Sequence, residues 1–561
     1  MAKKQGGWFL AKTLYDMGVR NIFTLAGGHI NPVYKACTDL GIRLIDTHHE
    51  QGAAMAADAF GRVTRTPGIC LVTAGPGFTN ALTGVAGSYL SNSPMLLIAG
   101  RSGVEENDIL SLQEIDQLSM VKPVTKWART VFDVKRIPEY VSNAYKNSIT
   151  GRPGPAYIGT SYEVLYPGCD EKELSNYTLK IPHTSSEPSD SEVEEMISMI
   201  RKSERPVLIT GSGSWYSRSE DEIQRFSEIL NIPLFTLNMG RGIVPDSSSF
   251  GIASPGSPRG FREITQKADL ILLFGIRLSI YIGFGNTFNP KAKIIQTDIE
   301  PSEIDRNKPT DLSIVSDLKS LLKKALSHLE ENNIEFKFNK WHKEATVISK
   351  KSYSEFTKQI LSSRKKMIHP AKVAHVVSEL LGDEGIIVVD GGDSQSWTDT
   401  TCTVNTPGHY IKGGPLGCMG VGIPFALGTK VAKPDKRVCL ITGDGAAAMN
   451  FMEFETAMRH KIPFVVVICN DSAWGMTKHQ IHITYPGVKN MQGVDLGFIP
   501  FHKIAIAMGG YGIAVDNTNK LKPAIQRAFR SGLPSVVNVK TDPDAVSGAT
   551  HTITEMMMKG M

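Results

Sequence analysis

The sequence has little cysteine and no long hydrophobic run. Its 7 cysteines in 561 residues include no Cys-x-x-Cys pair, and several lie inside apolar segments. This distribution indicates reduced core thiols rather than disulfides or metal ligands. No apolar run reaches about 18 residues, the length that spans a bilayer, and the start of the chain lacks the apolar core of a secretory signal. We therefore expect a cytoplasmic protein that is neither secreted nor inserted into a membrane.

Excess charge and low-complexity tracts are also absent. With 61 basic and 56 acidic residues the net charge is +5, which is slight for this length and argues against a nucleic-acid partner. The composition, 41% hydrophobic and 21% charged, is typical of a globular protein. The length allows about three domains, each with its own core.

Apolar strands and helical segments alternate along the chain and divide it into three α/β blocks. We expect domains at residues 1–180, 190–340 and 365–545, each a doubly wound parallel sheet. The polar segment 169–190 is predicted to be a linker. Residues 546–561 form a tail that is a candidate lid.

The segment 436–471 is the most informative part of the chain. Two short apolar runs, 437–442 and 463–469, predict neighbouring parallel strands covered on both faces. The first ends in Gly443-Asp444-Gly445 and the second in Asn470-Asp471. Because the carboxyl ends of parallel strands share one edge of a sheet, these oxygen ligands should meet there. Mg²⁺ prefers such oxygens and shares them with phosphates, so the segment predicts a metal-held diphosphate.

The backbone of this segment suits the same ligand. Gly443 and Gly445 permit close approach, and the amides of Ala446 and Ala447 begin a helix whose N-terminus favours an anion.

These motifs resemble those of thiamine-diphosphate (ThDP) enzymes of the acetolactate-synthase-like group. The 24 residues between Gly445 and Asn470 fit the ThDP signature. The resemblance implies the ThDP-binding fold, with a pyrimidine-binding, a central and a diphosphate-binding domain in that order, and ThDP and Mg²⁺ as cofactors. The other segments that carry it lie at 27–34, 48–62, 73–81, 112–116, 150–156 and 414–428.

Glu50 is the first catalytic candidate. It follows the expected strand 42–47 where a helix should begin, and the apolar residues after it would desolvate its carboxylate. The resemblance implies that Glu50 bonds the cofactor's pyrimidine ring, whose imino form then removes the thiazolium C2 proton.

The resemblance also implies the cofactor contacts. Asp444, Asp471 and the carbonyl of Ala473 would bind the metal, Met419 would support the bent cofactor, and Gly417 would accept from its amine. The remaining expected cofactor contacts are Gly392, Ser394, Gly443, Gly445, Ala446, Ala447 and Asn470.

Two residues depart from the family pattern. Asp471 stands where relatives usually have Asn, and its added charge predicts tighter metal binding. Asp393 is an unexpected neighbour for a phosphate, and the sequence offers no reason for it.

The substrate stays open between three relatives. Acetolactate synthases carry Trp where this chain has Gln480. Segments 239–246 and 274–285 resemble 2-hydroxyacyl-CoA lyase, but 388–397 lacks the sequence that helps such lyases hold CoA. FAD or ADP in the central domain also stays open.

Benzaldehyde lyase resembles the expected pocket best. The similarity lies around His29, at Gln113, and in 125–128 and 473–479. His29 would relay a proton at the substrate oxygen or cap a loop, and Gln113 would bond that oxygen. Two roles stay open for His48 and His49: they bind substrate or phosphate, or they have a structural role. The expected pocket residues are Gly28, Tyr162, Met476, His479 and Gln480, the last two on the acceptor side.

The predicted function is a ThDP- and Mg²⁺-dependent carboligase or lyase that makes or breaks carbon–carbon bonds. The resemblance implies an enamine, formed from a 2-oxo acid or 2-hydroxy ketone, that is protonated or transferred to a carbonyl acceptor. The alternatives are a 2-hydroxyacyl-CoA lyase and a simple 2-oxo acid decarboxylase. A non-catalytic scaffold would have lost Glu50 or Asp444, and both are present. The expected assembly is a homodimer or homotetramer with sites between subunits.

Overall fold

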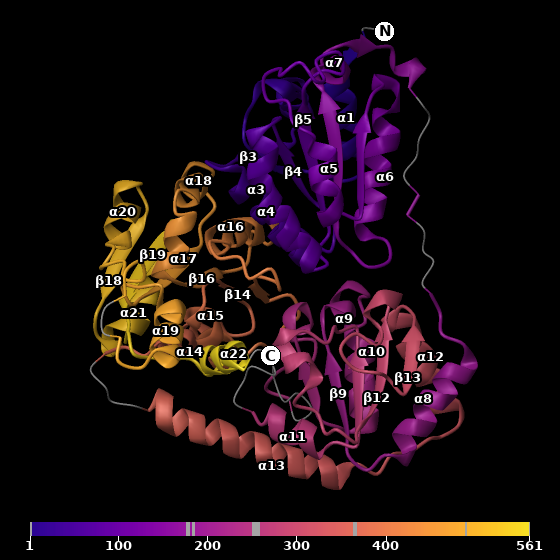
Figure 1. Ribbon diagram of the computed structural model, residues 1–561, viewed down its shortest axis with the longest axis vertical. Helices are drawn as coiled ribbons and strands as arrows, with labels where there is room; N and C mark the ends of the chain where they lie inside the picture. Colours follow the sequence, from indigo (N-terminus) through magenta and orange to yellow (C-terminus); the bar gives the residue numbers. More distant parts are fainter. Residues whose placement is uncertain are drawn as a thin grey trace.

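The computed structural model describes residues 3–174, 180–181, 186–248, 259–362, 367–488 and 491–559. Figure 1 shows three α/β domains, with the first above and the central and third domains side by side below it. Each of the three is built on a parallel sheet with helices on its faces, so the expected fold class is confirmed. Within the described ranges, no helix combines the length and apolar character needed to cross a bilayer.

The first domain has a six-stranded sheet in the order β3-β2-β4-β5-β7-β6. Its strands are β2 (Asn21–Thr24), β3 (Arg43–Asp46), β4 (Gly68–Val72), β5 (Met95–Arg101), β6 (Trp127–Val131) and β7 (Pro155–Ser161). Its helices are α1 (Gly6–Asp16), α2 (Asn31–Leu40), α3 (Glu50–Thr64), α4 (Pro76–Leu90), α5 (Gln117–Val121), α6 (Ile137–Ile149) and α7 (Tyr162–Leu165). A short antiparallel pair joins β1 (Lys4–Gln5) to β8 (Gly168–Cys169).

The central domain has a five-stranded sheet in the order β10-β9-β11-β12-β13. Its strands are β9 (Pro206–Thr210), β10 (Leu234–Thr236), β11 (Leu270–Phe274), β12 (Lys293–Asp298) and β13 (Leu312–Val315). Its helices are α8 (Asp190–Lys202), α9 (Ser212–Tyr216), α10 (Glu220–Leu230), α11 (Phe261–Lys267) and α12 (Leu318–Glu331). The charged helix α13 (Asn339–Phe356) then runs from the central domain toward the third (Figure 1).

The third domain has a six-stranded sheet in the order β15-β14-β16-β17-β19-β18. Its strands are β14 (Ile386–Val389), β15 (Tyr410–Lys412), β16 (Val438–Gly443), β17 (Val465–Asn470), β18 (Tyr511–Val515) and β19 (Ser535–Lys540). Its helices are α14 (Pro370–Leu381), α15 (Asp393–Thr401), α16 (Gly422–Ala432), α17 (Asp444–Met449), α18 (Glu453–Arg459), α19 (Gly475–Thr484), α20 (Phe501–Ala507), α21 (Thr518–Arg530) and α22 (Gly548–Met558).

The first and third sheets share one topology. Numbered along each domain, their strands stand in the order 2-1-3-4-6-5, and those of the central sheet in the order 2-1-3-4-5. In all three sheets the winding therefore reverses between the first and third strands, which are β2 and β4, β9 and β11, and β14 and β16. Such a reversal leaves a crevice at the carboxyl ends of the two strands, where open α/β sheets bind ligands.

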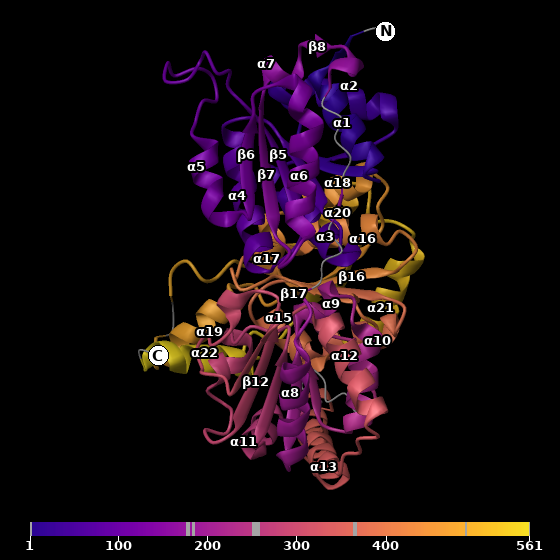
Figure 2. The same cartoon turned by 90° about the vertical axis from the view of Figure 1, so that its right-hand side faces the viewer.

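Small residues bring the first and third domains together. Helices α3 and α16 cross at Gly428, where an added Cβ would lie 2.1 Å from the carbonyl oxygen of Ala56. Glycine is required at this crossing because any side chain would force the two helices apart. Figure 2, a quarter turn from Figure 1, shows the third domain behind the junction of the other two.

The described residues cover the predicted linker and the predicted tail only in part. The linker 169–190 includes residues 175–179 and 182–185, which lie outside the described residues. The tail is helical, and α22 packs against α15 and α19 of the third domain.

Candidate functional site

A small pocket opens at the switch point of the third sheet. It has a volume of about 120 Å³ and lies where β14, β16 and β17 end. The expected residues that line it are Gly392, Ser394, Met419, Gly443, Asp444, Gly445, Ala446, Asp471, Ala473, Met476 and Gln480. This pocket therefore gathers most of the predicted metal and diphosphate contacts at one sheet edge.

A buried carboxylate, Asp444, and a half-buried one, Asp471, lie together in this pocket. Oδ1 of Asp444 accepts from its neighbour's amide, Gly445 N, at 3.0 Å, whereas its Oδ2 is buried with no hydrogen-bond partner. Burial, and then the nearby charge of Asp471, raise the pKa of Asp444. Burial likewise raises the pKa of Asp471. An unpartnered carboxylate oxygen beside a second carboxylate is unfavourable without a cation, so these residues fit a divalent metal.

The rest of a metal shell must come from other oxygens. Among the described residues, no group of three or more His, Cys, Asp or Glu side chains is placed to hold a metal. The Asp471 Oδ1 atom accepts from Ala473 N at 3.3 Å, which brings the Ala473 backbone to the site. Backbone carbonyl, water and phosphate oxygens are the ligands with which Mg²⁺ completes its octahedron.

Glycines make the pocket walls tight. A Cβ added to Gly445 would lie 2.5 Å from the Trp474 ring, and one added to Gly475 would lie 2.3 Å from Oδ2 of Asp471. Side chains at these positions would fill the cradle or displace the carboxylate.

A second cluster lies at the switch point of the first sheet. Glu50, the first residue of α3, is only 7% exposed, and Asn80 Nδ2 donates to its Oε2 at 3.0 Å. Gly77 separates Glu50 from Thr73, since a Cβ there would meet Oε1 of Glu50 at 3.3 Å and the Thr73 side chain at 2.7 Å. Asn80 and Thr73 had no predicted role, although both lie in the motif 73–81.

The expected substrate residues of the first domain gather around Thr73. His29 Nδ1 lies 3.2 Å from Thr73 Oγ1, and burial lowers the pKa of His29. The Tyr162 ring centroid is 6.4 Å from that of His29. The Gly28 carbonyl accepts from the hydroxyl of Tyr166 at 2.9 Å.

Gln113 lies on the other side of the same strand end. It adopts a positive φ of 66°, and its Cβ would be 2.7 Å from a Cβ added to Gly75. The contact with Gly75 connects Gln113 to the loop that begins at Thr73.

The third-domain pocket is lined by residues of the third domain alone. None of the residues lining the third-domain pocket belongs to the first domain. Met419, which should support the cofactor, is 38% exposed, and Gly417 is exposed in the same loop.

Four predicted positions of the third domain do not line this pocket. The Asn470 side chain instead donates to the Ile499 carbonyl at 3.0 Å and to Oδ1 of Asn538 at 3.1 Å. These two hydrogen bonds join the buried Asn470 side chain to the loop at Ile499 and to the adjacent strand β19. Gly417 and Ala447 are also absent from the lining, and Ala447 is buried within α17. The fourth is His479.

His479 is buried in a polar junction rather than on the acceptor side. Its Nδ1 lies 2.7 Å from Oδ2 of Asp393, and its Nε2 lies 2.8 Å from the Pro543 carbonyl. Oδ1 of Asp393 accepts from Thr550 Oγ1 at 2.6 Å and from Ser547 N at 3.2 Å. The junction therefore ties the pocket helices α15 and α19 to the C-terminal helix α22, which accounts for Asp393.

The junction is also an ion pair. Although burial opposes both shifts, the hydrogen bond between the two side chains lowers the pKa of Asp393 and raises the pKa of His479.

The two histidines before Glu50 have structural contacts. His48 Nε2 pairs with Glu455, and His49 Nδ1 accepts from Gln51 N at 3.1 Å as the N-cap of α3. Both contacts hold the start of the helix that carries Glu50.

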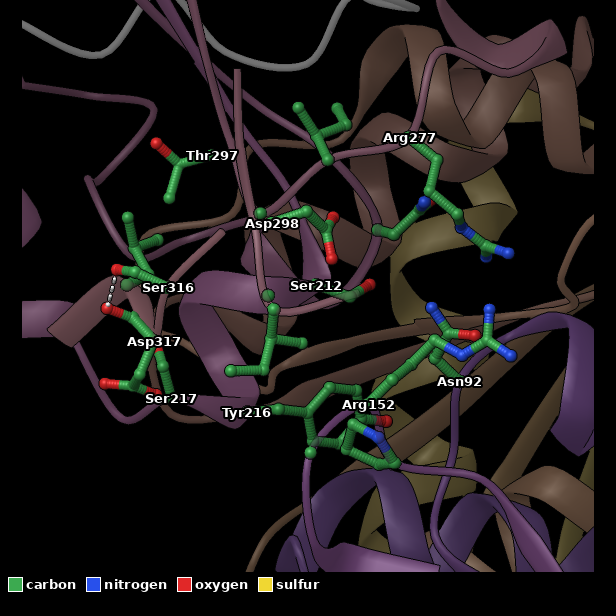
Figure 3. A pocket seen from close by; sticks show the side chains of 18 of the residues that line it. Asn92, Arg152, Ser212, Tyr216, Ser217, Arg277, Thr297, Asp298, Ser316 and Asp317 are labelled. Carbon is green, nitrogen blue, oxygen red and sulfur yellow. Dashed lines mark hydrogen bonds between the residues drawn. The ribbon is translucent and has the colours of Figure 1, made fainter. Parts of the chain in front are cut away.

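A larger pocket of about 500 Å³ lies at the switch point of the central sheet. In Figure 3 the ends of Arg152 and Arg277 lie on one side of it and Asp298 lies nearer the other. Burial raises the pKa of Asp298 to about 6 and lowers the pKa of Arg277. The Arg277 side chain donates to the Leu90 carbonyl at 2.6 Å, so the first domain contributes to this wall.

The junction at Asp393 predicts a pH-dependent stability difference. We expect Asp393→Asn to lower the free energy of unfolding by about 2 kcal/mol, because His479 loses a buried charged partner. Because folding raises the pKa of His479, its contribution to stability is complete below its unfolded-state pKa of about 6.5. Because folding lowers the pKa of Asp393, its contribution is complete above its unfolded-state pKa of about 4. The difference in the free energy of unfolding between the parent and Asp393→Asn should be largest between about pH 4 and about pH 6.5. It should shrink as the pH rises through the raised pKa of His479.

The measurement is urea denaturation of both proteins from pH 5 to 9, following the first transition. Asp495→Asn, which removes a 61% exposed partner of Lys478, is the control. A difference that does not change with pH would contradict the ion pair.

Comparison with known proteins supports the geometry. Family models of the thiamine pyrophosphate (TPP, that is ThDP) enzymes match in three places: the N-terminal TPP binding domain over 4–120, the central domain over 193–325, and the C-terminal TPP binding domain over 390–539. The acetolactate synthase large subunit of Mycobacterium tuberculosis is 30% identical over 538 residues, 96% of each chain.

Other relatives cover similar shares. The probable acetolactate synthase large subunit of Methanocaldococcus jannaschii is 32% identical over 557 residues, 96% of this chain and 92% of the relative. The 2-hydroxyacyl-CoA lyase 2 of Homo sapiens is 30% identical over 580 residues, 96% of this chain and 90% of the relative. The three family models follow the order of the three sheets. The chain therefore belongs to the thiamine pyrophosphate enzyme family, as the resemblance predicted.

Proposed function

We propose that this protein is a ThDP- and Mg²⁺-dependent enzyme that makes or breaks a carbon–carbon bond next to a carbonyl group. The observation that carries the proposal is the close pair Asp444 and Asp471 at a switch point, in which Asp444 is buried with one carboxylate oxygen unpartnered. Relatives named as acetolactate synthases and 2-hydroxyacyl-CoA lyases support a carboligase or lyase.

The third-domain pocket holds the diphosphate end of the cofactor in this proposal. Asp444, Asp471 and the Ala473 carbonyl bind Mg²⁺, while Ser394 and the amides after Gly443 face the phosphates. When bound, ThDP supplies a stabilised carbanion at its thiazolium C2 that adds to carbonyl carbons.

Glu50 and His29 handle protons in the proposed mechanism. The buried Glu50 carboxylate, oriented by Asn80, holds a proton at the pyrimidine ring and is shielded from water. His29 exchanges a proton with the substrate oxygen; its lowered pKa keeps the imidazole neutral near pH 7 and able to accept. Gln113 donates a hydrogen bond to that oxygen.

The proposed donors are 2-oxo acids or 2-hydroxy ketones. Gln480 lines the pocket and offers an amide where a bulky aromatic residue would restrict the acceptor. A 2-hydroxyacyl-CoA lyase is the second candidate, supported by the human relative of that name, and a simple 2-oxo acid decarboxylase is the third.

The proposal includes a homodimer or homotetramer in the cytoplasm, with each site built from two subunits. Apolar side chains next to Gln113 are highly exposed in the single chain: Ile109 by 66%, Leu110 by 96% and Leu112 by 82%. Water contact with such side chains is unfavourable, so this segment suits a subunit interface. An active monomer would contradict this arrangement.

A product screen tests the proposed reaction. The protein with ThDP and Mg²⁺ is incubated separately with pyruvate, a benzoin-type hydroxy ketone and a 2-hydroxyacyl-CoA, and products are identified by mass spectrometry. Acetolactate or a cleavage aldehyde would support the carboligase or lyase. Products formed only from the CoA ester would favour the 2-hydroxyacyl-CoA lyase. Carbon dioxide and a free aldehyde formed from pyruvate would favour the simple 2-oxo acid decarboxylase.

Glu50→Gln identifies the catalytic carboxylate in that screen. We expect turnover to fall at least about hundredfold, because an amide cannot exchange the proton, while ThDP affinity changes little. Glu139→Gln, which alters an exposed pair with Arg136, should leave turnover unchanged. Undiminished turnover in Glu50→Gln would overturn the mechanism.

Asp471→Asn tests the metal site. We expect Mg²⁺ affinity to fall about tenfold, because one anionic ligand becomes neutral. Protons compete with the metal for both carboxylates, and their raised pKa values make parent affinity fall as pH drops from 8 to 6. The variant should show a flatter pH dependence.

Calorimetric Mg²⁺ titration at saturating ThDP and pH 6, 7 and 8 measures this effect. Asp495→Asn is the matched surface control. Unchanged or tighter binding in Asp471→Asn would refute the role of the added charge.

The central pocket is proposed to take a nucleoside diphosphate. Arg152 and Arg277 suit the phosphates, and Asp298, at the end of β12, suits ribose hydroxyls.

Calorimetry should detect ADP binding to the parent protein, and this binding should weaken at least about tenfold in Arg277→Met. Arg225→Met, which changes an exposed arginine, is the control. A purified protein that is yellow from bound FAD would contradict the ADP assignment.

A further inference from the structure

Helix α18 of the third domain contacts the segment of the first domain that leads into Glu50. Figure 1 shows α18 beside β3 and α3. Arg459 and His460, at the end of α18, contact the two carboxylate oxygens of Asp46 at 2.6 and 2.8 Å. The Arg43 side chain donates to the His460 carbonyl at 2.6 Å. These side chains are partly exposed, so each ion pair contributes little by itself.

The buried contact in this interface is made by Glu453, the first residue of α18. Its side chain is 1% exposed. Oε1 accepts from the amides of His48 and His49 at 3.2 and 3.1 Å, and Oε2 accepts from His48 N at 3.2 Å and Thr456 Oγ1 at 2.7 Å. The two amides belong to the residues directly before Glu50, at the point where the backbone turns from β3 into α3.

Gly52 permits this contact. A Cβ added to Gly52 would lie 2.6 Å from Oε1 of Glu453 and 2.8 Å from its carboxyl carbon. Any side chain at Gly52 would therefore push the Glu453 carboxylate off the two amides.

We propose that Glu453 is a positioning residue that fixes the Glu50 carboxylate at the pyrimidine end of the cofactor site. The inference rests on the proposed function, in which Glu50 exchanges the proton. Glu453 does not touch the reacting atoms in this assignment; it acts through the backbone of His48 and His49.

The physical reason is the short path between the two carboxylates. Glu50 is the first helical residue of α3, so the backbone of His49, the N-cap, sets the direction in which its side chain leaves. Two charge-assisted hydrogen bonds at this turn restrict that direction far more than an exposed ion pair does. Proton transfer depends steeply on such placement, because an error of about 1 Å costs about a hundredfold in rate.

The test uses two variants that disturb the same contact from opposite sides. Glu453→Gln removes the charge that the amides bond, and Gly52→Ala displaces the carboxylate while leaving Glu453 in place. Glu384→Gln is the matched control, because it makes the same substitution in the same domain at a 78% exposed partner of Lys436.

The first measurement is amide hydrogen exchange of the full-length protein without added cofactor. We expect the amides of residues 48 and 49 to exchange at least about tenfold faster in Glu453→Gln and Gly52→Ala, and at the parent rate in Glu384→Gln. Parent-like protection in both variants would overturn the proposal.

The second measurement needs no substrate. With saturating ThDP and Mg²⁺ in D₂O, exchange of the cofactor C2 proton is followed by acid quench and NMR. We expect Glu453→Gln and Gly52→Ala to slow this exchange at least about tenfold, with ThDP affinity within about threefold of the parent. A loss of affinity with unchanged exchange would indicate a general structural role and overturn the proposal.

Glu50→Gln separates the two levels of inference. If it exchanges the C2 proton at the parent rate, the proposed function is wrong at Glu50. If Glu50→Gln is slow while both test variants exchange at the parent rate, only the positioning role of Glu453 is wrong.

Discussion

A parallel strand covered on both faces has no room for a ligand along its length, so polar groups for binding must follow its carboxyl end. This constraint acts three times in the chain. In each sheet the winding reverses between the first and third strands, and a cluster or pocket lies at that reversal. The repeated order in the first and third sheets gives two equivalent edges, one with Glu50 and the other with Asp444.

The charges at these edges explain how the cofactor site is built. Asp444 is buried beside Asp471, whose charge disfavours the ionised form of Asp444 until a cation lies between them. Glycines on either side let the backbone close around that point. By contrast, the buried Glu453 carboxylate accepts from two backbone amides, although burial still raises its pKa. A carboxylate thus serves the proposed metal site in one place and a backbone turn in another.

The metal-binding segment could be predicted because its parts are local. Asp444 and Asp471 follow adjacent strands of one β-α-β unit, and their strand types were evident from the apolar runs. The roles of Asp393 and His479 could not be predicted, because their partners are distant in the chain. Asp393 bonds residues 86 and 157 positions away, and no periodicity or spacing connects such pairs. The bond from the Asn470 amide to Asn538 could not be predicted for the same reason, since the two residues lie 68 positions apart.

The sequence by itself determined the family, the three-domain order and the carboxylates of the proposed metal site. These follow from short motifs in which neighbouring positions must all be correct, as in Gly443-Asp444-Gly445. Only the tertiary structure decided which side chains hold those motifs in place. Glu453 reaches the amides before Glu50 across 404 and 405 positions of the chain, because domain packing rather than local pattern brings α18 against α3.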